Sequence, residues 1–253
     1  MSRVVVISNR VMLPKEKKPE AAGGLAVALF DTLQETNGLW FGWSGRVTTN
    51  EEVKPNVKKD EGITYAIVDL TKKDYENYYN GYCNEVLWPI FHYRLDLVAY
   101  SKLKFESYKS VNKSFSLKIK KLLNNDDLIW VHDYHFLLIA KELRKLKCTQ
   151  KIGFFLHIPW PSKEILTALP DHRELVDALL EFDLIGFQTR KHVLTFLDYI
   201  ISELGGSVEP DGSIFALGKK SKVKHFPISI DCLLYTSDAA DEGLGVDLGG
   251  RRI

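Results

Sequence analysis

The chain has 253 residues, of which 45% are hydrophobic and 26% are charged, and its formal net charge is +1. This composition is typical of a globular protein with a real core, and a net charge so close to zero argues against a nucleic acid bound through bulk charge. No apolar run approaches the roughly 20 residues of a membrane span. We therefore expect neither a nucleic-acid nor a membrane partner.

The three cysteines, Cys83, Cys148 and Cys232, follow no disulfide or metal-binding spacing. A reducing, cytoplasmic location is the simplest interpretation. His132 and His135 could ligate a metal, but two histidines without thiolate neighbours are a weak metal signal. We expect no metal and no cofactor.

The first strand is expected at Val4–Ser8, and Asn9 and Arg10 follow its carboxyl end. A polar loop then leads to Gly23 and Gly24, which open a predicted helix. Strand, loop, glycine pair and helix N-terminus suit an anion such as phosphate, because free N–H groups and the helix dipole favour negative charge. By itself, the glycine pair fits an ordinary helix start better than a ligand site.

The stretch after this helix is rich in aromatic residues. Strands are expected at Leu39–Gly45 and Ile63–Leu70, with a helix following the second. Trp40 and Trp43 on the first of these strands favour the core over a sugar-stacking platform. The helix carries four tyrosines on one stripe, which is usually a buried arrangement: Tyr75, Tyr78, Tyr79 and Tyr82.

Two short apolar runs in the middle of the chain, Leu128–Val131 and Ile152–Leu156, flank a helical pattern at Phe136–Lys147. Strand, helix and strand in so few residues predict two parallel neighbouring strands. Asp133 and His157 follow the ends of these strands. Because ligands bind beyond the carboxyl ends of parallel strands, we expect Asp133 and His157 to share one cleft.

The rest of the chain alternates helices and strands. A long amphipathic helix precedes the strand–helix–strand unit, and further helices and strands follow it. The predicted segments are Ser101–Leu123, Lys163–Leu169, Asp171–Glu181 and Thr189–Leu204 as helices, and Asp183–Phe187 and Lys222–Ile228 as strands. This alternation predicts an α/β protein with a Rossmann-like, doubly wound, mostly parallel sheet.

Each candidate site residue also has a purely structural interpretation. Asp133 is well placed to cap the helix at Phe136, and a histidine at a strand end is often a hydrogen-bonded structural residue. Taken together, Arg10, the glycine pair, Asp133 and His157 should project from the same sheet edge. An arginine forks onto phosphate, an aspartate accepts from sugar hydroxyls, and a neutral histidine bonds a hydroxyl or a carbonyl. The set predicts a site for a phosphorylated polar ligand, and no Walker phosphate loop or nucleophile elbow competes with it.

Several long motifs follow one another along the chain: SNRVMLP, AGGLAVAL, GLWFGWSG, YYNGYCNEVLWPIFHYRLDL, IWVHDYHFLLIAKELRK, IGFFLHIPWPSKEI and DLIGFQT. In this order they resemble the trehalose-6-phosphate synthase family over nearly all of Val4–Ile230. The resemblance implies the N-terminal lobe of a two-domain GT-B glycosyltransferase. It also implies transfer of glucose from UDP-glucose to glucose 6-phosphate in trehalose biosynthesis, with retained anomeric configuration and no required metal.

On the acceptor side, the resemblance implies that Arg10 binds the acceptor's phosphate. It implies that Tyr79 and Asp133 are acceptor-site residues, and Trp40 is a further candidate for lining the acceptor pocket. Asp133 is also counted among the catalytic residues.

On the donor side, Gly23 and Gly24 resemble residues whose backbone contacts the sugar nucleotide. His157 resembles a catalytic residue that meets the transferred glucose through its main chain or ring. Trp88 and Ile158 resemble positions tied to the choice of the α anomer.

We expect residues 1–231 to form the acceptor-binding lobe. Residues 232–253 back-translate onto a transposase-type sequencing adapter, so we expect them to be read-through and not native. The family's second lobe would hold the phosphates of UDP, so the chain as written is expected to turn over poorly or not at all. A non-catalytic sugar-phosphate-sensing subunit of the same fold, or an acceptor such as glycerol 3-phosphate, remains an alternative. Self-association and association with a trehalose-phosphate phosphatase are left open.

Overall fold

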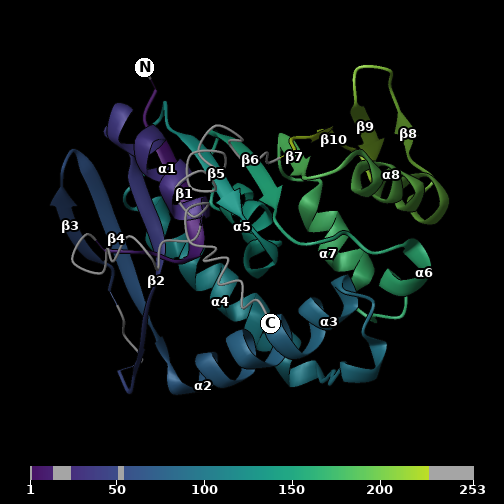
Figure 1. Cartoon of the computed structure of the whole chain (residues 1–253), viewed down its shortest axis with the longest axis horizontal. Helices are drawn as coiled ribbons and strands as arrows, with labels where there is room; N and C mark the ends of the chain where they lie inside the picture. Colours follow the sequence, from purple (N-terminus) through teal and green to yellow (C-terminus); the bar gives the residue numbers. More distant parts are fainter. Residues whose placement is uncertain (1, 14–23, 51–53, 228–253) are drawn as a thin grey trace, which may run out of the picture.

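The computed structural model describes residues 2–13, 24–50 and 54–227. Its strands are β1 (Val4–Arg10), β2 (Leu39–Thr48), β3 (Asn56–Asp60), β4 (Ile63–Thr71), β5 (Leu128–His132), β6 (Lys151–Leu156), β7 (Leu184–Phe187), β8 (Ser207–Val208), β9 (Ser213–Ala216) and β10 (Lys219–His225). They form one sheet in the order β3-β4-β2-β1-β5-β6-β7-β10-β9-β8 (Figure 1). Every neighbouring pair from β4 to β10 is parallel. Antiparallel pairs occur only towards the two edges of the described sheet.

The helices are α1 (Gly24–Glu35), α2 (Lys72–Asp74), α3 (Trp88–Phe91), α4 (Lys102–Lys120), α5 (Ile139–Lys145), α6 (Lys163–Leu166), α7 (His172–Leu179) and α8 (Arg190–Leu204), with a π-helix η3 (Tyr75–Leu87) and short 3₁₀ turns η4 (Leu95–Leu97) and η5 (Tyr134–Phe136). Side-chain caps set several of their starts. The hydroxyls of Thr71, Ser101 and Thr189 each accept a backbone N–H three residues on. Gly205, with φ of +62°, ends α8 in the left-handed conformation that glycine adopts without strain.

The two faces of the sheet are covered unequally. The larger core lies between the sheet and α4, α5, α7, α8 and η3, whereas a smaller core around Val6, Leu33 and Trp40 lies beneath α1. Figure 1 shows α1 in front of β1, and α2 and α3 along the lower rim of the sheet, where the parallel strands end. The central strands are apolar on both faces, as in β1, where Val4 to Ile7 are all buried.

The predicted α/β class and parallel sheet are confirmed, with three differences in detail. The helix expected at Phe136–Lys147 is broken into η5 and α5, the helix after Thr71 is mostly a π-helix, and the edge strands β3, β8 and β9 were not predicted. In the part of the chain that the structure describes, no helix is long and apolar enough to cross a membrane. Residues 232–253, predicted to be read-through, lie outside the described residues, and the division at residue 231 stays a prediction.

Candidate active site at the carboxyl edge of the sheet

Three adjacent strands, β1, β5 and β6, end beside one another. Ile7 on β1 pairs with Val131 on β5, which pairs with Phe154 on β6. Since neighbouring strands lie about 4.8 Å apart, the residues that leave these strands start from neighbouring points on one edge of the sheet. They are Arg10 from β1, Asp133 from β5 and His157 from β6.

Asp133 occupies a strained turn between β5 and η5, with φ of +71° and ψ of 170°. Residues other than glycine avoid this region, which costs about 1–3 kcal/mol. Its N–H donates to the carbonyl of Phe155 at 2.9 Å, and its Oδ1 accepts from the N–H of His157 at 3.3 Å. The turn therefore ties the end of β5 to the end of β6.

The carboxylate of Asp133 makes no capping hydrogen bond to the helix that follows it. The interpretation of Asp133 as a helix cap is therefore wrong, because the unusual backbone turns the carboxylate towards β6. Burial raises the pKa of Asp133 to about 6, against the lowering effect of the backbone N–H groups of Tyr134 and His157. A carboxyl that is half neutral near pH 6 beside a polar edge is typical of functional sites.

His157, directly after β6, meets His132, the last residue of β5. Nδ1 of His132 and Nε2 of His157 are 3.0 Å apart, and the ring centroids are 5.3 Å apart. Burial lowers the pKa of His132 to about 3 and that of His157 to about 4, so both rings are neutral at pH 7. The main-chain carbonyl of His157 accepts a hydrogen bond from Nε2 of Gln188, which follows β7, at 2.6 Å.

Arg10, the last residue of β1, is exposed and follows an irregularity in the pairing with β2. Its guanidinium lies over Gly45: a Cβ added to Gly45 would stand 2.9 Å from Cζ of Arg10. Gly45 also has φ of +84°, which other residues adopt only under strain. Within the described residues no carboxylate pairs with Arg10, so its charge is available to an anion.

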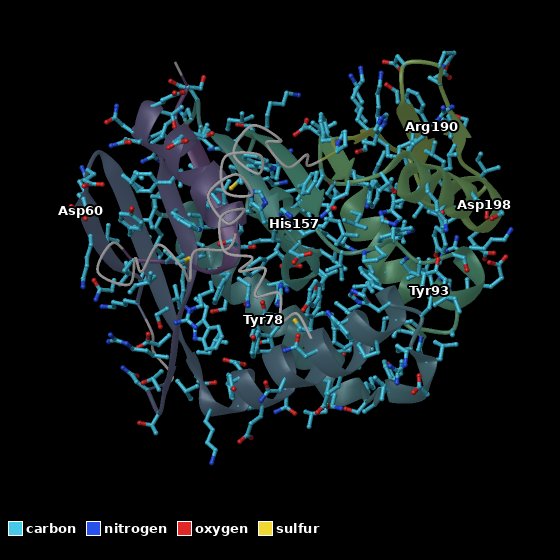
Figure 2. The ribbon with its side chains drawn as sticks, in the orientation of Figure 1. Asp60, Tyr78, Tyr93, His157, Arg190 and Asp198 are labelled. Carbon is cyan, nitrogen blue, oxygen red and sulfur yellow. The ribbon has the colours of Figure 1, made fainter. Side chains whose placement is uncertain are left out.

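Tyr79 on η3 brings an aromatic wall to the same edge. Its ring centroid lies 4.9 Å from that of Trp43, 5.6 Å from that of Tyr75 and 6.0 Å from that of His135. The predicted tyrosine stripe is thus split, because Tyr78 and Tyr82 are fully buried whereas Tyr75 and Tyr79 are half-buried. π-helical segments are frequent at functional sites. In Figure 2, His157 lies near the centre, between β6 and the helix that carries Tyr78.

The turn that carries Asp133 is supported from beneath by α4, a role that sequence reasoning missed. The hydroxyl of Tyr108 donates to the carbonyl of Tyr134 at 2.7 Å and accepts from the N–H of Leu137 at 3.0 Å. Asn112 donates to the carbonyl of His135 at 3.2 Å. The available signal was a buried polar stripe at helical spacing, Tyr108, Asn112 and Ser116, inside an amphipathic helix.

Trp40 and Trp43 are core residues, as predicted, at 4% and 6% exposure. Trp40 is fixed through Nε1 to the hydroxyl of Ser8 at 2.8 Å. Trp88 is unusually open for its size, at 40%, and stacks on His92 with centroids 4.0 Å apart. Ile158 is half-buried against the main core. Within the described residues, neither Trp88 nor Ile158 hydrogen-bonds or stacks with Asp133 or His157.

Gly24 is the first residue of α1, and Gly23 lies outside the described residues. Because β2 starts beside Val5 directly after α1 ends, α1 runs back along β1 and its N-terminus faces the carboxyl edge. An apolar cavity of about 650 Å³ borders the histidine pair on this same face, lined by Leu29, Trp130 and Phe155 among others. No group of three metal-ligating side chains occurs among the residues that the structure describes.

The fold and the residues at the carboxyl edge of the sheet first define a class of protein. In Rossmann-like α/β proteins with a mostly parallel sheet, ligands bind beyond the carboxyl ends of the strands. In the described part of this chain, that edge carries a guanidinium without an ion-pair partner, a half-buried carboxyl and a neutral histidine pair. The comparison with protein families is specific. The description "Glycosyltransferase family 20" matches residues 2–244, and the chain belongs to that family.

Named relatives support the same family. The trehalose-6-phosphate synthase of Cronobacter sakazakii is 45% identical over 231 residues, covering 91% of this chain and 48% of that protein. The corresponding protein of Citrobacter koseri is 47% identical over 232 residues, with the same coverage. The chain thus spans about half the length of the curated relatives it matches.

Solved structures show the same fold. An α,α-trehalose-phosphate synthase (UDP-forming) from Burkholderia vietnamiensis matches with a TM-score of 0.91 and 42% identity, over 97% of this chain and 52% of that one. A Burkholderia xenovorans enzyme in complex with glucose-6-phosphate matches with a TM-score of 0.86 and 42% identity, over 96% and 54%. An Escherichia coli protein bound with UDP-2-fluoro glucose matches with a TM-score of 0.85 and 41% identity, over 97% of this chain and 52% of that one.

Proposed function

We propose that this chain is the acceptor-binding part of a retaining glucosyltransferase that moves glucose from UDP-glucose to glucose 6-phosphate, forming α,α-trehalose 6-phosphate. The observation that carries the proposal is that Arg10, Asp133 and His157 leave the ends of three adjacent parallel strands, with Asp133 hydrogen-bonded to the main chain of His157. Family membership supports the chemistry, as do related structures described with glucose-6-phosphate and with a UDP-glucose analogue.

In this proposal, the free guanidinium of Arg10 binds the phosphate of the acceptor, and Gly45 leaves room for it. The carboxyl of Asp133 accepts from sugar hydroxyls, and Tyr79 forms the side of the acceptor pocket. The N-terminus of α1 at Gly24 faces the phosphates of the donor, where the helix dipole favours negative charge. Trp88 and Ile158 contribute to the choice of the α anomer.

The chemical step is then a front-face displacement, in which the acceptor hydroxyl attacks the face that UDP leaves and a phosphate oxygen of the leaving group takes its proton. His157 contacts the transferred glucose, and Asp133 holds the acceptor in line. Catalysis by this lobe consists of positioning and of electrostatic stabilisation, not of a nucleophilic carboxylate pair. A cytoplasmic location belongs to the same proposal, because both substrates are charged phosphate esters.

Binding of glucose 6-phosphate to this chain tests the acceptor site directly. Calorimetric titration should show binding of glucose 6-phosphate and much weaker binding of glucose. Arg10→Gln should weaken the binding of glucose 6-phosphate about 10- to 100-fold, because a hydrogen bond to a charged group contributes about 1.5–3 kcal/mol. The variant should leave the binding of glucose unchanged.

Arg173→Gln is the matched control, because Arg173 is exposed on α7 and, within the described residues, makes no hydrogen bond or ion pair with Arg10, Asp133 or His157. Equal affinity of the Arg10 variant and the parent chain would contradict the acceptor site. Glucosyl transfer is tested separately, as UDP release in the presence of both substrates from the complete coding sequence. Tight acceptor binding without UDP release there would favour the sugar-phosphate sensor.

A further inference from the structure

We propose that His132 is a positioning residue: it donates its Nδ1–H to Nε2 of His157 and so holds His157 with its own proton on Nδ1, as a hydrogen-bond donor towards the ligand. The inference deepens the proposed function and rests on it for the identity of the ligand. Its structural content, the proton positions in the two rings, is independent of any ligand.

The contact that joins the two rings is short and specific. Nδ1 of His132 lies 3.0 Å from Nε2 of His157, which is hydrogen-bond distance. Two neutral imidazoles can share one proton in this contact, so one ring donates and the other accepts. The geometry leaves two arrangements, which differ in which ring carries the shared proton.

The other nitrogen of His132 decides between these arrangements. Nε2 of His132 is buried and has no hydrogen-bond partner among the described residues. If His157 donated, the proton of His132 would sit on that Nε2 as a buried N–H without an acceptor, which native proteins rarely contain. If His132 donates, its Nε2 carries only a lone pair, a lesser defect. The proton therefore lies on Nδ1 of His132.

The tautomer of His157 follows from that of His132. With Nε2 of His157 accepting, a neutral His157 must carry its proton on Nδ1. Nδ1 of His157 has no hydrogen-bond partner within the described residues, and His157 itself is only half-buried. The free N–H is thus the polar group that the ring can offer to an oxygen of a bound sugar or phosphate.

The rest of the environment fixes the position of His157 without competing for its ring nitrogens. The ring of Phe155 lies edge-on to that of His157, with centroids 4.7 Å apart. The indole of Trp130 packs on the ring of His132, with centroids 4.5 Å apart. Asp133 binds the main-chain N–H of His157, and Gln188 binds its carbonyl. No carboxylate contacts either imidazole among the described residues, so the histidine pair acts as a neutral donor relay.

Nitrogen NMR on the whole chain labelled with ¹⁵N-histidine tests the inference directly. Long-range ¹H–¹⁵N spectra at pH 8 distinguish protonated from unprotonated ring nitrogens, and a His157→Gln variant identifies the signals of His157. We expect both His132 and His157 in the Nδ1–H form. A wild-type His157 in the Nε2–H form, or in a mixture of the two, would overturn the inference.

Two variants of similar shape separate the hydrogen bond from packing. His132→Asn keeps an N–H near the position of Nδ1, so His157 should stay in the Nδ1–H form. His132→Asp replaces the donor by an acceptor, so the proton of His157 should move to Nε2. An unchanged His157 tautomer in the aspartate variant would contradict the role of His132. Should that variant not fold, the wild-type spectrum alone decides.

The ligand provides a separate readout. When glucose 6-phosphate or UDP-glucose is added to the labelled wild-type chain, the Nδ1 signal of His157 should shift while His132 keeps its tautomer. If the tautomers are as inferred but neither ligand binds, the proposed function fails and the inference about the pair stands. If a ligand binds and His157 is in the Nε2–H form, the inference fails and the proposed function stands.

Discussion

At the scale of single residues, the candidate site contains backbone conformations and a carboxyl whose burial destabilises the fold. Asp133 holds a backbone conformation that glycine prefers, in a place where burial opposes its charge. Gly45 has a left-handed conformation, and because it lacks a side chain it leaves room for the guanidinium of Arg10. Strain and desolvation at such positions persist when the surrounding structure imposes them, and they are commonest at sites that bind or react. Both residues therefore yield predictions about stability and about binding.

Asp133→Asn should stabilise the fold while it weakens the acceptor site. The pKa of Asp133 rises from 3.8 to about 6, and one unit corresponds to about 1.4 kcal/mol. If Asp133 were fully buried, its charge would destabilise the fold by about 3 kcal/mol. Because Asp133 is partly exposed, the expected gain in stability of Asp133→Asn is about 1–2 kcal/mol. Between pH 4 and 6 the carboxyl of Asp133 binds more protons in the folded chain than in the unfolded one, so the contribution of this residue to stability falls as the pH rises.

Urea unfolding as a function of pH checks this expectation. The advantage of Asp133→Asn should grow from pH 4 to pH 6 and stay constant above. Asp126→Asn, at an exposed position, should stay within about 0.5 kcal/mol of the parent. A destabilised asparagine variant at pH 8 would show that the charge of Asp133 is compensated in the fold.

Gly45→Ala should disable Arg10. An alanine Cβ would come within 2.9 Å of the guanidinium carbon and would also adopt φ near +84°, so we expect both a loss of stability and a loss of glucose 6-phosphate affinity. Gly218→Ala is the matched control, since Gly218 has φ of +73° and nothing within 4 Å. It should lose about 1 kcal/mol of stability and keep full affinity. Equal affinities in the two variants would refute the link between Gly45 and Arg10.

At the scale of elements, the site depends on how helices hold the strand ends. The π-helix η3 carries Tyr79 to the edge, and α4 pins the turn after β5 through Tyr108 and Asn112. These bonds satisfy backbone groups that the break between η5 and α5 leaves unpaired. The turn that carries Asp133 is therefore only as rigid as its attachment to α4.

Tyr108→Phe should destabilise the protein by about 2–3 kcal/mol, because it leaves the buried carbonyl of Tyr134 and the N–H of Leu137 without partners. Glucose 6-phosphate affinity should fall with it, through the loosened turn. Tyr100→Phe provides the comparison, since its exposed hydroxyl makes one 3.3 Å contact to Asp171, and it should cost less than about 0.5 kcal/mol. Chemical denaturation of both variants decides, and equal costs would contradict the support role.

At the scale of the whole molecule, one sheet gathers residues from position 10 to position 188 at a single edge. The same burial that builds this edge excludes charge from its histidines. Burial lowers the pKa of His132 and His135 to about 3 and that of His157 to about 4. The folded chain keeps these rings neutral, whereas the unfolded chain protonates them below about pH 6.5.

The free energy of unfolding should therefore fall as the pH drops from 6.5 towards 4. The unfolded chain binds the extra protons in this window, so stability rises with pH and levels above 6.5. Asp133 opposes the trend below pH 6, but one carboxyl acts against three histidines. We expect a loss of about 2–4 kcal/mol between pH 6.5 and 5, measured by urea unfolding. His135→Phe should flatten the slope, and a stability independent of pH would contradict the neutral, buried state of these rings.

Local pattern was enough for much of this protein. Apolar runs predicted β1, β2, β4, β5, β6 and β7, because buried parallel strands need continuous hydrophobic residues. Parallel connectivity then predicted that Arg10, Asp133 and His157 leave the same edge, and the structure puts Asp133 and His157 in contact. Roles for Tyr79, Trp88 and Ile158 came from resemblance, since no local pattern separates an aromatic stripe in the core from one at a site.

Only the tertiary structure decided the features that depend on contacts between distant segments. The pairing of His132 with His157, the clamp of Gln188, the fit of Gly45 to Arg10 and the support from Tyr108 each join residues at least 25 positions apart. The direction of the Asp133 carboxylate also belongs here, because a left-handed backbone angle depends on the surrounding packing. The sequence by itself determined which residues leave the sheet edge, since the position of each apolar run fixes where its strand ends. What those residues touch was decided by the fold, because hydrogen bonds and burial arise only when the strands stand side by side.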